Sequence, residues 1–315
     1  MTAASSTVAL FTHSACLGHD PGAFHPECPD RLRHVMAALE AEEFSALLRE
    51  TAPLATREQL ARVHTDAHLD GLFALDPAAG ELIAIDADTM VGPGSVAAAR
   101  RAAGGAAAAV DAVMRGWAGT AFVATRPPGH HAKRDRAMGF CLFSTAAVAA
   151  RHAQAAYGVG RVAVVDFDVH HGNGTQDAMQ GDPTLFYAST HQWPCYPGTG
   201  AAHETGSADN VVNVPLPPYT AGPGFRAAWS DTILPALRAW RPDLLIVSAG
   251  FDAHRDDPLA QLMVDETDFA WLTAELLAVA RQHCGGRLVS VLEGGYDLSA
   301  LARSCAAHVR SLLRD

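Results

Sequence analysis

The stretch Val162-Ala163-Val164-Val165-Asp166-Phe167-Asp168-Val169-His170 joins a short apolar run directly to acidic and histidine residues. Its β-branched, nearly continuous apolar run, Val162–Phe167, is typical of a strand buried on both faces of a sheet. In an extended chain alternate residues share a face, so Asp166, Asp168 and His170 point one way and Phe167 and Val169 the other. Two carboxylates and an imidazole on one edge are costly to desolvate unless a cation or donors compensate them. No Lys or Arg is interleaved, which disfavours a salt-bridged strand end and predicts a cation site.

Three more short apolar runs have the same character, at Ala121–Thr125, Leu244–Ser248 and Leu288–Leu292. Helical stretches lie between the runs, and Thr56-Arg57-Glu58-Gln59 has the spacing of a capping box. The helical stretches are Ser95–Gly116, Gly222–Trp240, Thr267–His283 and Leu298–Leu313. Strands that alternate with helices predict an α/β fold with a mainly parallel central sheet and helices on both faces.

Polar, glycine-flanked residues follow each of the four runs. Arg126-Pro127-Pro128-Gly129-His130-His131 follows the first, Asp252 and His254 follow the third, and Glu293-Gly294-Gly295-Tyr296 follows the fourth. Ligands bind at the carboxyl ends of the strands of an open parallel sheet. Four strands that end in this way predict one site at that edge.

Asp168, His170 and Asp252 would make a three-ligand metal site with an open position for water, which is the catalytic type. None of the six cysteines lies in a Cys-x-x-Cys pair, which disfavours a structural zinc site. Oxygen-rich ligation also fits manganese or ferrous iron. Beside such a metal, the pair His130 and His131 could do acid–base work. The hydroxyl of Tyr296 could donate to a developing oxyanion.

The bulk properties limit the other classes of function. With 315 residues and no internal repeat or Gly/Ser linker, residues 1–315 are predicted to form a single domain. A net charge of −11 without a dense basic run disfavours nucleic acid as the direct ligand. No segment is apolar enough to span a membrane, and Met1–Cys16 lacks the pattern of a secretory signal, so a cytoplasmic location with reduced thiols is expected. The sequence is compatible with a homo-oligomer.

Six segments resemble motifs of the zinc-dependent histone deacetylases and acetylpolyamine amidohydrolases and occur in the family's order. Their residues are more similar to those of class II enzymes and bacterial relatives than to those of class I. The resemblance runs from about the first helix to the end of the chain and implies a three-layer arginase/deacetylase-like fold. The segments are Arg126–Ala132, Met138–Cys141, Asp166–Gln176, Pro197–Gly200, Gly250–His254 and Leu292–Tyr296.

The resemblance implies a metal and a set of catalytic residues. Asp168, His170 and Asp252 match the ligands of one zinc ion, for which ferrous iron could substitute. His131 matches the main general base and later acid, and His130 matches its electrostatic partner. Three further matches are Asp166 behind His130, Asn173 behind His131 where class I enzymes have an Asp, and Tyr296 as the group that polarises the amide carbonyl.

Substrate contacts are implied in the same way. Phe140 and Tyr196 match the aromatic walls of an acyl-lysine tunnel, and the Gly139 carbonyl matches the acceptor of the substrate N–H. Leu259 stands where the polyamine-preferring relative has a Glu, which favours acyl-lysine or a neutral amide. Asp88 is expected on the rim, where it would bind backbone N–H groups of the substrate.

The family also binds a potassium ion near the zinc. The resemblance implies that Asp166, Asp168, His170, Ser189 and the Thr190 carbonyl are its ligands.

The sequence therefore predicts a metal-dependent enzyme that removes acetyl or other acyl groups from lysine side chains of a peptide or protein. The first alternative is a small-molecule amidohydrolase that acts on acetylpolyamines or another acylated amine. The others are a binuclear manganese ureohydrolase of the arginase type and an acyl-binding protein without activity. The loop Gly18–Pro29, with His19, His25 and Glu27, is expected to shape the tunnel mouth; exposed-loop histidines are usually inert, so no ligand is assigned there.

Overall fold

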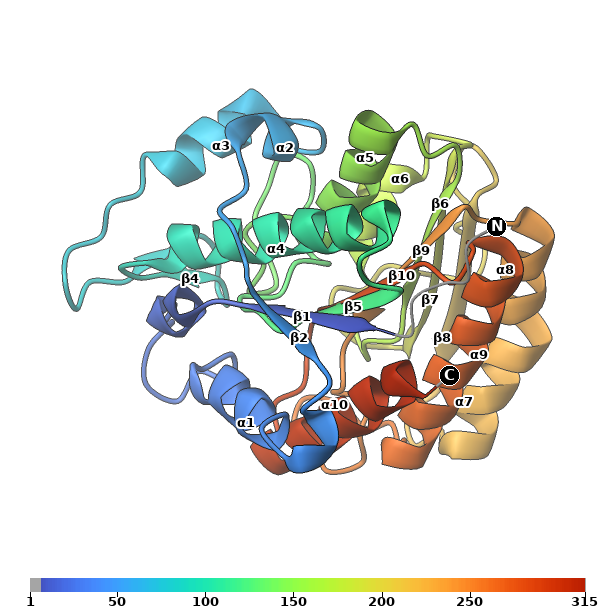
Figure 1. Cartoon of the computed structure of the whole chain (residues 1–315). Coiled ribbons are helices and arrows are strands. Elements are labelled where there is room, and N and C mark those ends of the chain that lie inside the picture. Colours follow the sequence, from blue (N-terminus) through green and yellow to red (C-terminus); the bar gives the residue numbers. More distant parts are fainter. Residues whose placement is uncertain (1–6, 315) are drawn as a thin grey trace.

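The computed structural model describes residues 7–314, and its centre is an eight-stranded sheet in which every pairing is parallel (Figure 1). The order is β2-β1-β5-β10-β9-β6-β7-β8. The strands are β1 (Val8–Thr12), β2 (Leu48–Thr51), β5 (Thr120–Val123), β6 (Val162–Asp166), β7 (Leu185–Gln192), β8 (Val211–Leu216), β9 (Leu244–Ala249) and β10 (Leu288–Leu292). The predicted parallel sheet is confirmed.

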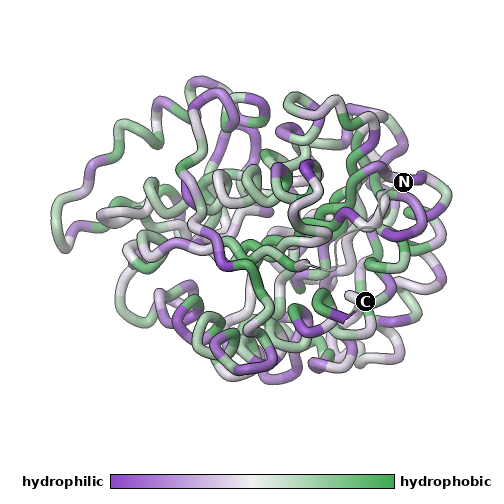
Figure 2. The backbone as a smooth tube through the Cα atoms, viewed as in Figure 1, coloured by the Kyte–Doolittle hydropathy of each residue, from purple (hydrophilic) through white to green (hydrophobic). Residues whose placement is uncertain are grey.

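Helices cover both faces of this sheet, because successive strand residues bury their side chains on opposite sides. Val162 and Val164 belong to one buried cluster with residues of α4 (Ser95–Arg115) and α5 (Thr145–Tyr157). Ala163 and Val165 belong to another, with residues of α1 (Asp30–Ala38), α9 (Glu266–His283) and α10 (Leu298–Leu313). Figure 2 shows the central strands as largely hydrophobic. The α-helices are α1 (Asp30–Ala38), α2 (Arg57–Ala61), α3 (Asp66–Phe73), α4 (Ser95–Arg115), α5 (Thr145–Tyr157), α6 (Asn173–Met179), α7 (Gly222–Ala228), α8 (Leu234–Trp240), α9 (Glu266–His283) and α10 (Leu298–Leu313).

Short elements complete the chain. They are the 3₁₀ turns η1 (Ser14–Gly18) and η2 (Glu42–Phe44), the π-helical turn η3 (Trp229–Ile233), and an antiparallel hairpin of β3 (Ile83–Ala84) and β4 (Met90–Val91). Within the described residues, no helix has the length and apolar character that a membrane crossing requires. Residues 1–6, which begin the segment Met1–Cys16 considered above as a possible signal, lie outside the described part.

One predicted helix is interrupted. The stretch Gly222–Trp240 is helical throughout, but the turn Trp229–Ile233 between α7 and α8 is π-helical. Pro235 follows this turn and has no N–H for the α-helical bond to the carbonyl of Asp231. The missing donor is the physical reason for the change in the hydrogen-bond ladder.

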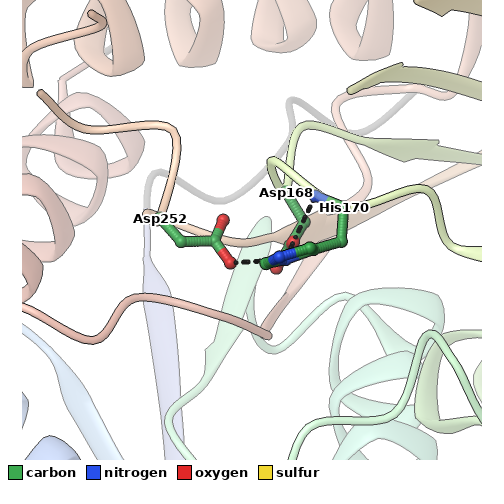
Figure 3. A group of neighbouring side chains, drawn as sticks. All are labelled: Asp168, His170 and Asp252. Carbon is green, nitrogen blue, oxygen red and sulfur yellow. Dashed lines mark hydrogen bonds and ion pairs between the residues drawn. The ribbon is translucent and has the colours of Figure 1, made fainter. Parts of the chain in front are cut away.

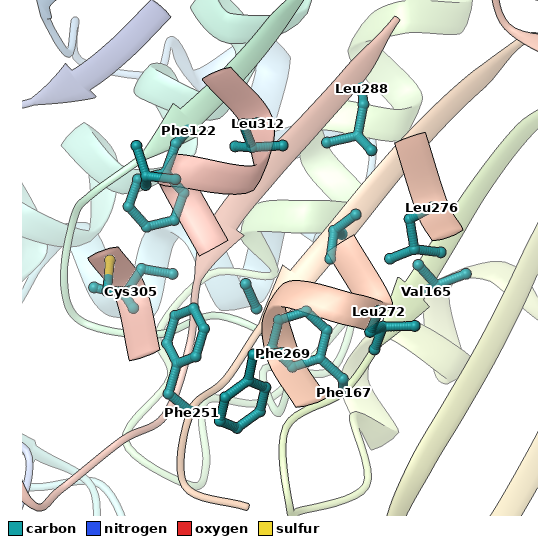
Figure 4. Packing of buried hydrophobic residues seen from close by; sticks show 14 of the residues in the cluster. Phe122, Val165, Phe167, Phe251, Phe269, Leu272, Leu276, Leu288, Cys305 and Leu312 are labelled. Carbon is teal, nitrogen blue, oxygen red and sulfur yellow. The ribbon is translucent and has the colours of Figure 1, made fainter. Parts of the chain in front are cut away.

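An aromatic cluster in the core fixes the two segments that bear the candidate metal ligands (Figure 4). Phe167 lies between Asp166 and Asp168, and its ring centroid is 5.6 Å from that of Phe251, which directly precedes Asp252. Both rings pack on Phe269 of α9, at 5.6 and 5.2 Å between centroids. Such contacts hold the two loops at a defined separation. The alternation predicted for residues 166–170 is thus observed, since Phe167 and Val169 enter the core.

Candidate active site

Asp168, His170 and Asp252 converge at the carboxyl ends of β6 and β9 (Figure 3). Nδ1 of His170 lies 3.1 Å from Oδ1 of Asp168 and 3.1 Å from Oδ2 of Asp252. One ligand atom from each residue lies within 4.8 Å of the other two, and all three residues are buried. The structure therefore brings together the three residues that the sequence predicted as ligands.

Backbone N–H groups orient both carboxylates. The Val169 amide donates to Asp252 Oδ1 at 2.8 Å, and the Gly294 amide donates to Asp168 Oδ2 at 2.8 Å. A Cβ atom on residue 294 would collide with the carboxylates of Asp168 and Asp252. Glycine is therefore required at position 294, because the backbone approaches the two acids so closely.

The donor set fits a divalent cation. In the described part of the chain, neither Asp168 nor Asp252 forms an ion pair with a Lys or Arg side chain. Burial and the nearby charge of Asp168 raise the pKa of Asp252 to about 7. Two buried carboxylates that have no Lys or Arg partner are unfavourable unless a positive charge lies between them. Two oxygens and one imidazole nitrogen with a free fourth position suit zinc or ferrous iron.

The two adjacent histidines differ in their partners. Nδ1 of His130 donates to Asp166 Oδ2 at 3.0 Å, and Nδ1 of His131 donates to the neutral Asn173 Oδ1 at 2.8 Å. Burial alone would lower the pKa of His130, but the carboxylates of Asp168 and Asp166 outweigh it and raise that pKa. Burial and the neighbouring His130 lower the pKa of His131 well below its ordinary value. This environment favours a charged His130 beside a neutral His131.

The carboxylate of Glu293 holds the loop of His130 and His131 in place, a role that was not predicted from the sequence. This residue ends up fully buried one position after β10. Its Oε2 accepts hydrogen bonds from the amides of Gly129 and His130 at 2.7 and 3.1 Å, and its Oε1 accepts one from Ser248 Oγ at 3.0 Å. Burial raises its pKa to about 7. A charged residue directly after a continuous apolar strand was the available signal.

Replacing Glu293 with leucine is expected to lower kcat by about one to two orders of magnitude. The buried amides of Gly129 and His130 lose their acceptor, and each unsatisfied amide costs about 1–3 kcal/mol. Glu293→Gln is the matched control: its amide oxygen can still accept from Gly129 and His130, so most of kcat should remain. Steady-state kinetics of the metal-loaded variants, with thermal melts to confirm folding, provide the measurement. Equal kcat in the leucine variant and the wild type would contradict this positioning role.

A pocket of about 190 Å³ opens beside the candidate ligands. All five residues predicted to contact substrate line it, together with His131, His170 and Tyr296. The five are Asp88, Gly139, Phe140, Tyr196 and Leu259. Ring centroids lie 5.0 Å apart for His131 and Tyr196 and 5.9 Å apart for Phe140 and Tyr296, so the walls are largely aromatic.

The backbone turns sharply where Phe140 enters this pocket. Met138 and Cys141 exchange two main-chain hydrogen bonds, and the residues between them, Gly139 and Phe140, have φ of 56° and 67°. Two positive φ values are characteristic of a type I′ turn. Phe140 is also held by its amide, which donates to Thr89 Oγ1 at 3.1 Å.

Asp257 links the segments of Tyr296 and Leu259 on the other wall of the pocket, a role that was not predicted from the sequence. Its Oδ2 accepts from the Tyr296 amide at 2.6 Å and its Oδ1 from the Leu259 amide at 3.0 Å. The Arg31 guanidinium lies 4.8 Å from the centre of the Tyr296 ring. Burial and the carboxylates of Asp252 and Asp168 outweigh Arg31 and hold the pKa of Tyr296 well above its ordinary value, so its hydroxyl remains a donor.

The loop Gly18–Pro29 was expected to be exposed, but two of its side chains are buried. His19 and Glu27 are buried, and the ring of His19 lies 3.1 Å from the Glu27 carboxylate. Glu27 also accepts from Arg126 at 2.6 and 2.8 Å and from Arg31 at 2.9 Å. The two guanidinium groups outweigh the desolvation of Glu27 and hold its pKa well below the usual range. The base of the loop is therefore a buried ionic network, because a partner far along the chain covers it.

Two of the residues predicted to bind potassium lie side by side on neighbouring strands. The sheet register pairs Asp166 of β6 with Ser189 of β7. Oδ2 of Asp166 accepts from His130 and from the Tyr187 hydroxyl, and Oγ of Ser189 lies 2.9 Å from His191 Nδ1. Potassium binding at this position stays a prediction.

Comparison with known proteins gives consistent similarities. A model of the histone deacetylase domain matches residues 25–312. An uncharacterized protein of Synechocystis is 41% identical over 310 residues, which cover 97% of this chain and 99% of that protein. A histone deacetylase-like amidohydrolase of Pseudomonas aeruginosa is 41% identical over 303 residues, 92% of this chain and 79% of that protein. The crystal structure of the HDA15 HD domain superposes with a TM-score of 0.92 at 37% identity, covering 98% of this chain and 89% of that one, which confirms the predicted deacetylase-like fold.

Proposed function

This chain belongs to the histone deacetylase domain family of hydrolases, and from that premise we propose that it removes acyl groups from lysine side chains of a peptide or protein. The observation that carries the proposal is the buried trio Asp168, His170 and Asp252, which adjoins a pocket lined by His131 and Tyr296. A binuclear site of the arginase type would need further acidic ligands where this chain has the histidine pair.

We infer that zinc, or ferrous iron in its place, occupies the trio. When bound, such an ion supplies Lewis-acid chemistry and lowers the pKa of a coordinated water. Asp168, His170 and Asp252 would hold it, with the Val169 and Gly294 amides fixing the carboxylates. For the nearby potassium site we propose Asp166, Asp168, His170, Ser189 and the Thr190 carbonyl.

His131 takes the proton of the attacking water in the proposed mechanism. Its Nδ1 is committed to Asn173, so Nε2 is left as the basic atom of a neutral ring. His130, paired with Asp166, carries positive charge that stabilises the developing negative charge nearby. The histidine pair then returns a proton to the leaving amine, so the amide C–N bond breaks and a carboxylic acid and a free amine are formed.

Tyr296 donates its hydroxyl proton in a hydrogen bond to the carbonyl oxygen of the scissile amide. That oxygen gains negative charge as the tetrahedral intermediate forms, and the hydrogen bond strengthens as it does so. Asp257 and Arg31 position Tyr296 through its amide and its ring.

The pocket favours a long, neutral acylated side chain. Phe140 and Tyr196 offer aromatic surface to the methylene groups of lysine, and the Gly139 carbonyl can accept the amide N–H. Leu259 on the same lining carries no charge that would attract a second cation, which disfavours an acetylpolyamine.

A substrate panel tests this proposal: acetyl-lysine peptides, longer acyl-lysine peptides and acetylputrescine, assayed with and without chelator. We expect chelator-sensitive turnover of the peptides and weak turnover of acetylputrescine. Leu259→Glu should raise kcat/KM for acetylputrescine about tenfold, since a carboxylate near the pocket attracts its free ammonium group, and Leu259→Gln controls for polarity without charge. A strong preference of the wild type for the diamine would overturn the lysine assignment.

A further inference from the structure

The pocket opens beside a surface that combines exposed apolar side chains with unpaired carboxylates. We define this rim as residues 18–29 and 76–91, which contain no Lys or Arg. The ring of Phe24 is fully exposed, and Leu82 and Ile85 are exposed on the neighbouring segment. Exposed apolar side chains that gather in this way commonly mark a contact surface.

The two segments of the rim contact each other. A Cβ atom on Gly22 would lie 2.9 Å from Leu82 Cδ1, and one on Gly92 would lie 2.9 Å from the Asp20 carbonyl and 3.1 Å from Leu82 Cδ2. His25 Nε2 lies 3.1 Å from the Asp88 carbonyl. In Figure 1 both segments project from the body of the molecule at the left, beside β4.

The exposure of Phe24 follows from a firmly held loop. The loop is anchored at one end by buried His19 and at the other by buried Glu27. Phe24 itself has φ of 66°, a left-handed conformation that costs a bulky residue of order 1 kcal/mol or more. The backbone of Phe24 is thus in an unfavourable conformation, and its exposed ring adds no packing that would stabilise the fold. This combination points to a contact with another molecule.

The rim is continuous with the pocket. Asp88 belongs to both, and the ring of His25, next to Phe24, lies 4.8 Å from the ring of the pocket residue Phe140. A lysine side chain that enters the pocket would leave its own main chain at the mouth, so the residues beside that lysine would lie within reach of the rim.

The charge of the rim indicates which kind of partner it attracts. Five of its carboxylates form no ion pair with any residue between 7 and 314, and the rim contains no Lys or Arg to balance them. They are Asp20, Asp76, Glu81, Asp86 and Asp88. An uncompensated acidic surface attracts cations and repels acidic partners.

We propose that the rim is the docking surface for the polypeptide that flanks the acylated lysine, and that it selects a flank with an apolar side chain and a positively charged side chain. This inference rests on the proposed function. Phe24 and Leu82 cover the apolar side chain, and the carboxylates attract the basic one. A small acylated amine is too short to reach these contacts.

Binding and turnover of three labelled acetyl-lysine peptides test the proposal, with flanks of Leu and Arg, of Leu and Glu, or of Gly and Gln. We expect Phe24→Ser and Leu82→Ser each to weaken binding of the Leu–Arg peptide about tenfold by fluorescence anisotropy. They should leave the Gly–Gln peptide unchanged. Leu54→Ser is the control, since Leu54 lies outside the rim and its exposure of 39% is close to the 43% of Leu82.

Charge is tested separately with the double variant Asp20→Asn, Glu81→Gln, whose amides keep acceptor oxygens for the local turns. It should reduce the preference for Leu–Arg over Leu–Glu several-fold, and added salt should do the same in the wild type. Glu50→Gln is the control outside the rim.

Two results would overturn the inference. One is equal affinity for all three peptides in the wild type. The other is a change of oligomeric state in Phe24→Ser without a change in peptide binding, which would assign the surface to a second copy of the chain. Failure to hydrolyse any acyl-lysine peptide would instead count against the proposed function, because the binding measurement does not depend on turnover.

Discussion

Asp168→Ala is expected to abolish binding of the catalytic metal and to lower turnover by at least about a thousandfold. Asp168 supplies one of the two carboxylates of the trio, and its loss leaves His170 and Asp252 as a two-ligand remnant. A metal that polarises the amide and activates water contributes several kcal/mol to the transition state, which corresponds to a rate factor of that size. Elemental analysis of the purified protein and steady-state rates with added zinc provide the measurement.

Asp231→Ala serves as the matched control for Asp168→Ala, since Asp231 is exposed in the turn Trp229–Ile233 and belongs neither to the trio nor to the pocket lining. It should keep about one ion per chain and wild-type turnover. Thermal melts of both variants separate loss of metal from loss of fold. A fully metallated and active Asp168→Ala protein would contradict the assignment of the trio.

Tyr296→Phe is expected to keep the metal and lose about 10²–10³ in kcat, the usual cost of one oxyanion donor. Phenylalanine preserves the ring that packs beside Arg31 and Phe140, so only the hydroxyl is removed. KM should change much less than kcat, because the hydrogen bond is strongest in the transition state. Kinetics on an acetyl-lysine peptide, together with metal analysis, check both parts of the expectation.

The exposed Tyr219 gives the control for this substitution, and Tyr219→Phe should be indistinguishable from the wild type. Retained full activity in Tyr296→Phe would remove Tyr296 from the mechanism. Loss of the metal in the same variant would show that its role is structural rather than electrostatic.

The central strands of the fold were predictable from local pattern. The apolar run at Leu288–Leu292 has the bounds of β10, and those at Val162 and Leu244 differ from β6 and β9 by one residue at one end. These strands are buried on both faces, so their sequences carry an unbroken apolar signal.

The outer strands were not predicted. Leu48–Thr51, at one edge of the sheet, is fully exposed and mostly polar, so nothing in its composition distinguishes it from a loop. Leu185–Gln192 is buried but ends in the polar residues Ser189–Gln192, which interrupt its apolar signal. Their pairing partners, far along the chain, decide the conformation of both segments.

The metal trio and the histidine pair were predictable because their residues follow strands directly and resemble family motifs. The supporting residues were not, since their roles depend on distant partners. Glu27 is buried only because Arg126 and Arg31 cover it, and Asp257 matters only because Tyr296 folds back onto it. A sequence that places an acid in a Pro-rich loop gives no local sign of such burial.

The most direct test of the whole account is a crystal structure of the zinc-loaded protein, with anomalous diffraction measured on both sides of the zinc absorption edge. The account predicts one strong anomalous peak per chain, bonded to an oxygen of Asp168, Nδ1 of His170 and an oxygen of Asp252, with the fourth position facing the pocket between His131 and Tyr296. A peak coordinated by other residues, or two adjacent metal ions bridged by carboxylates, would contradict it.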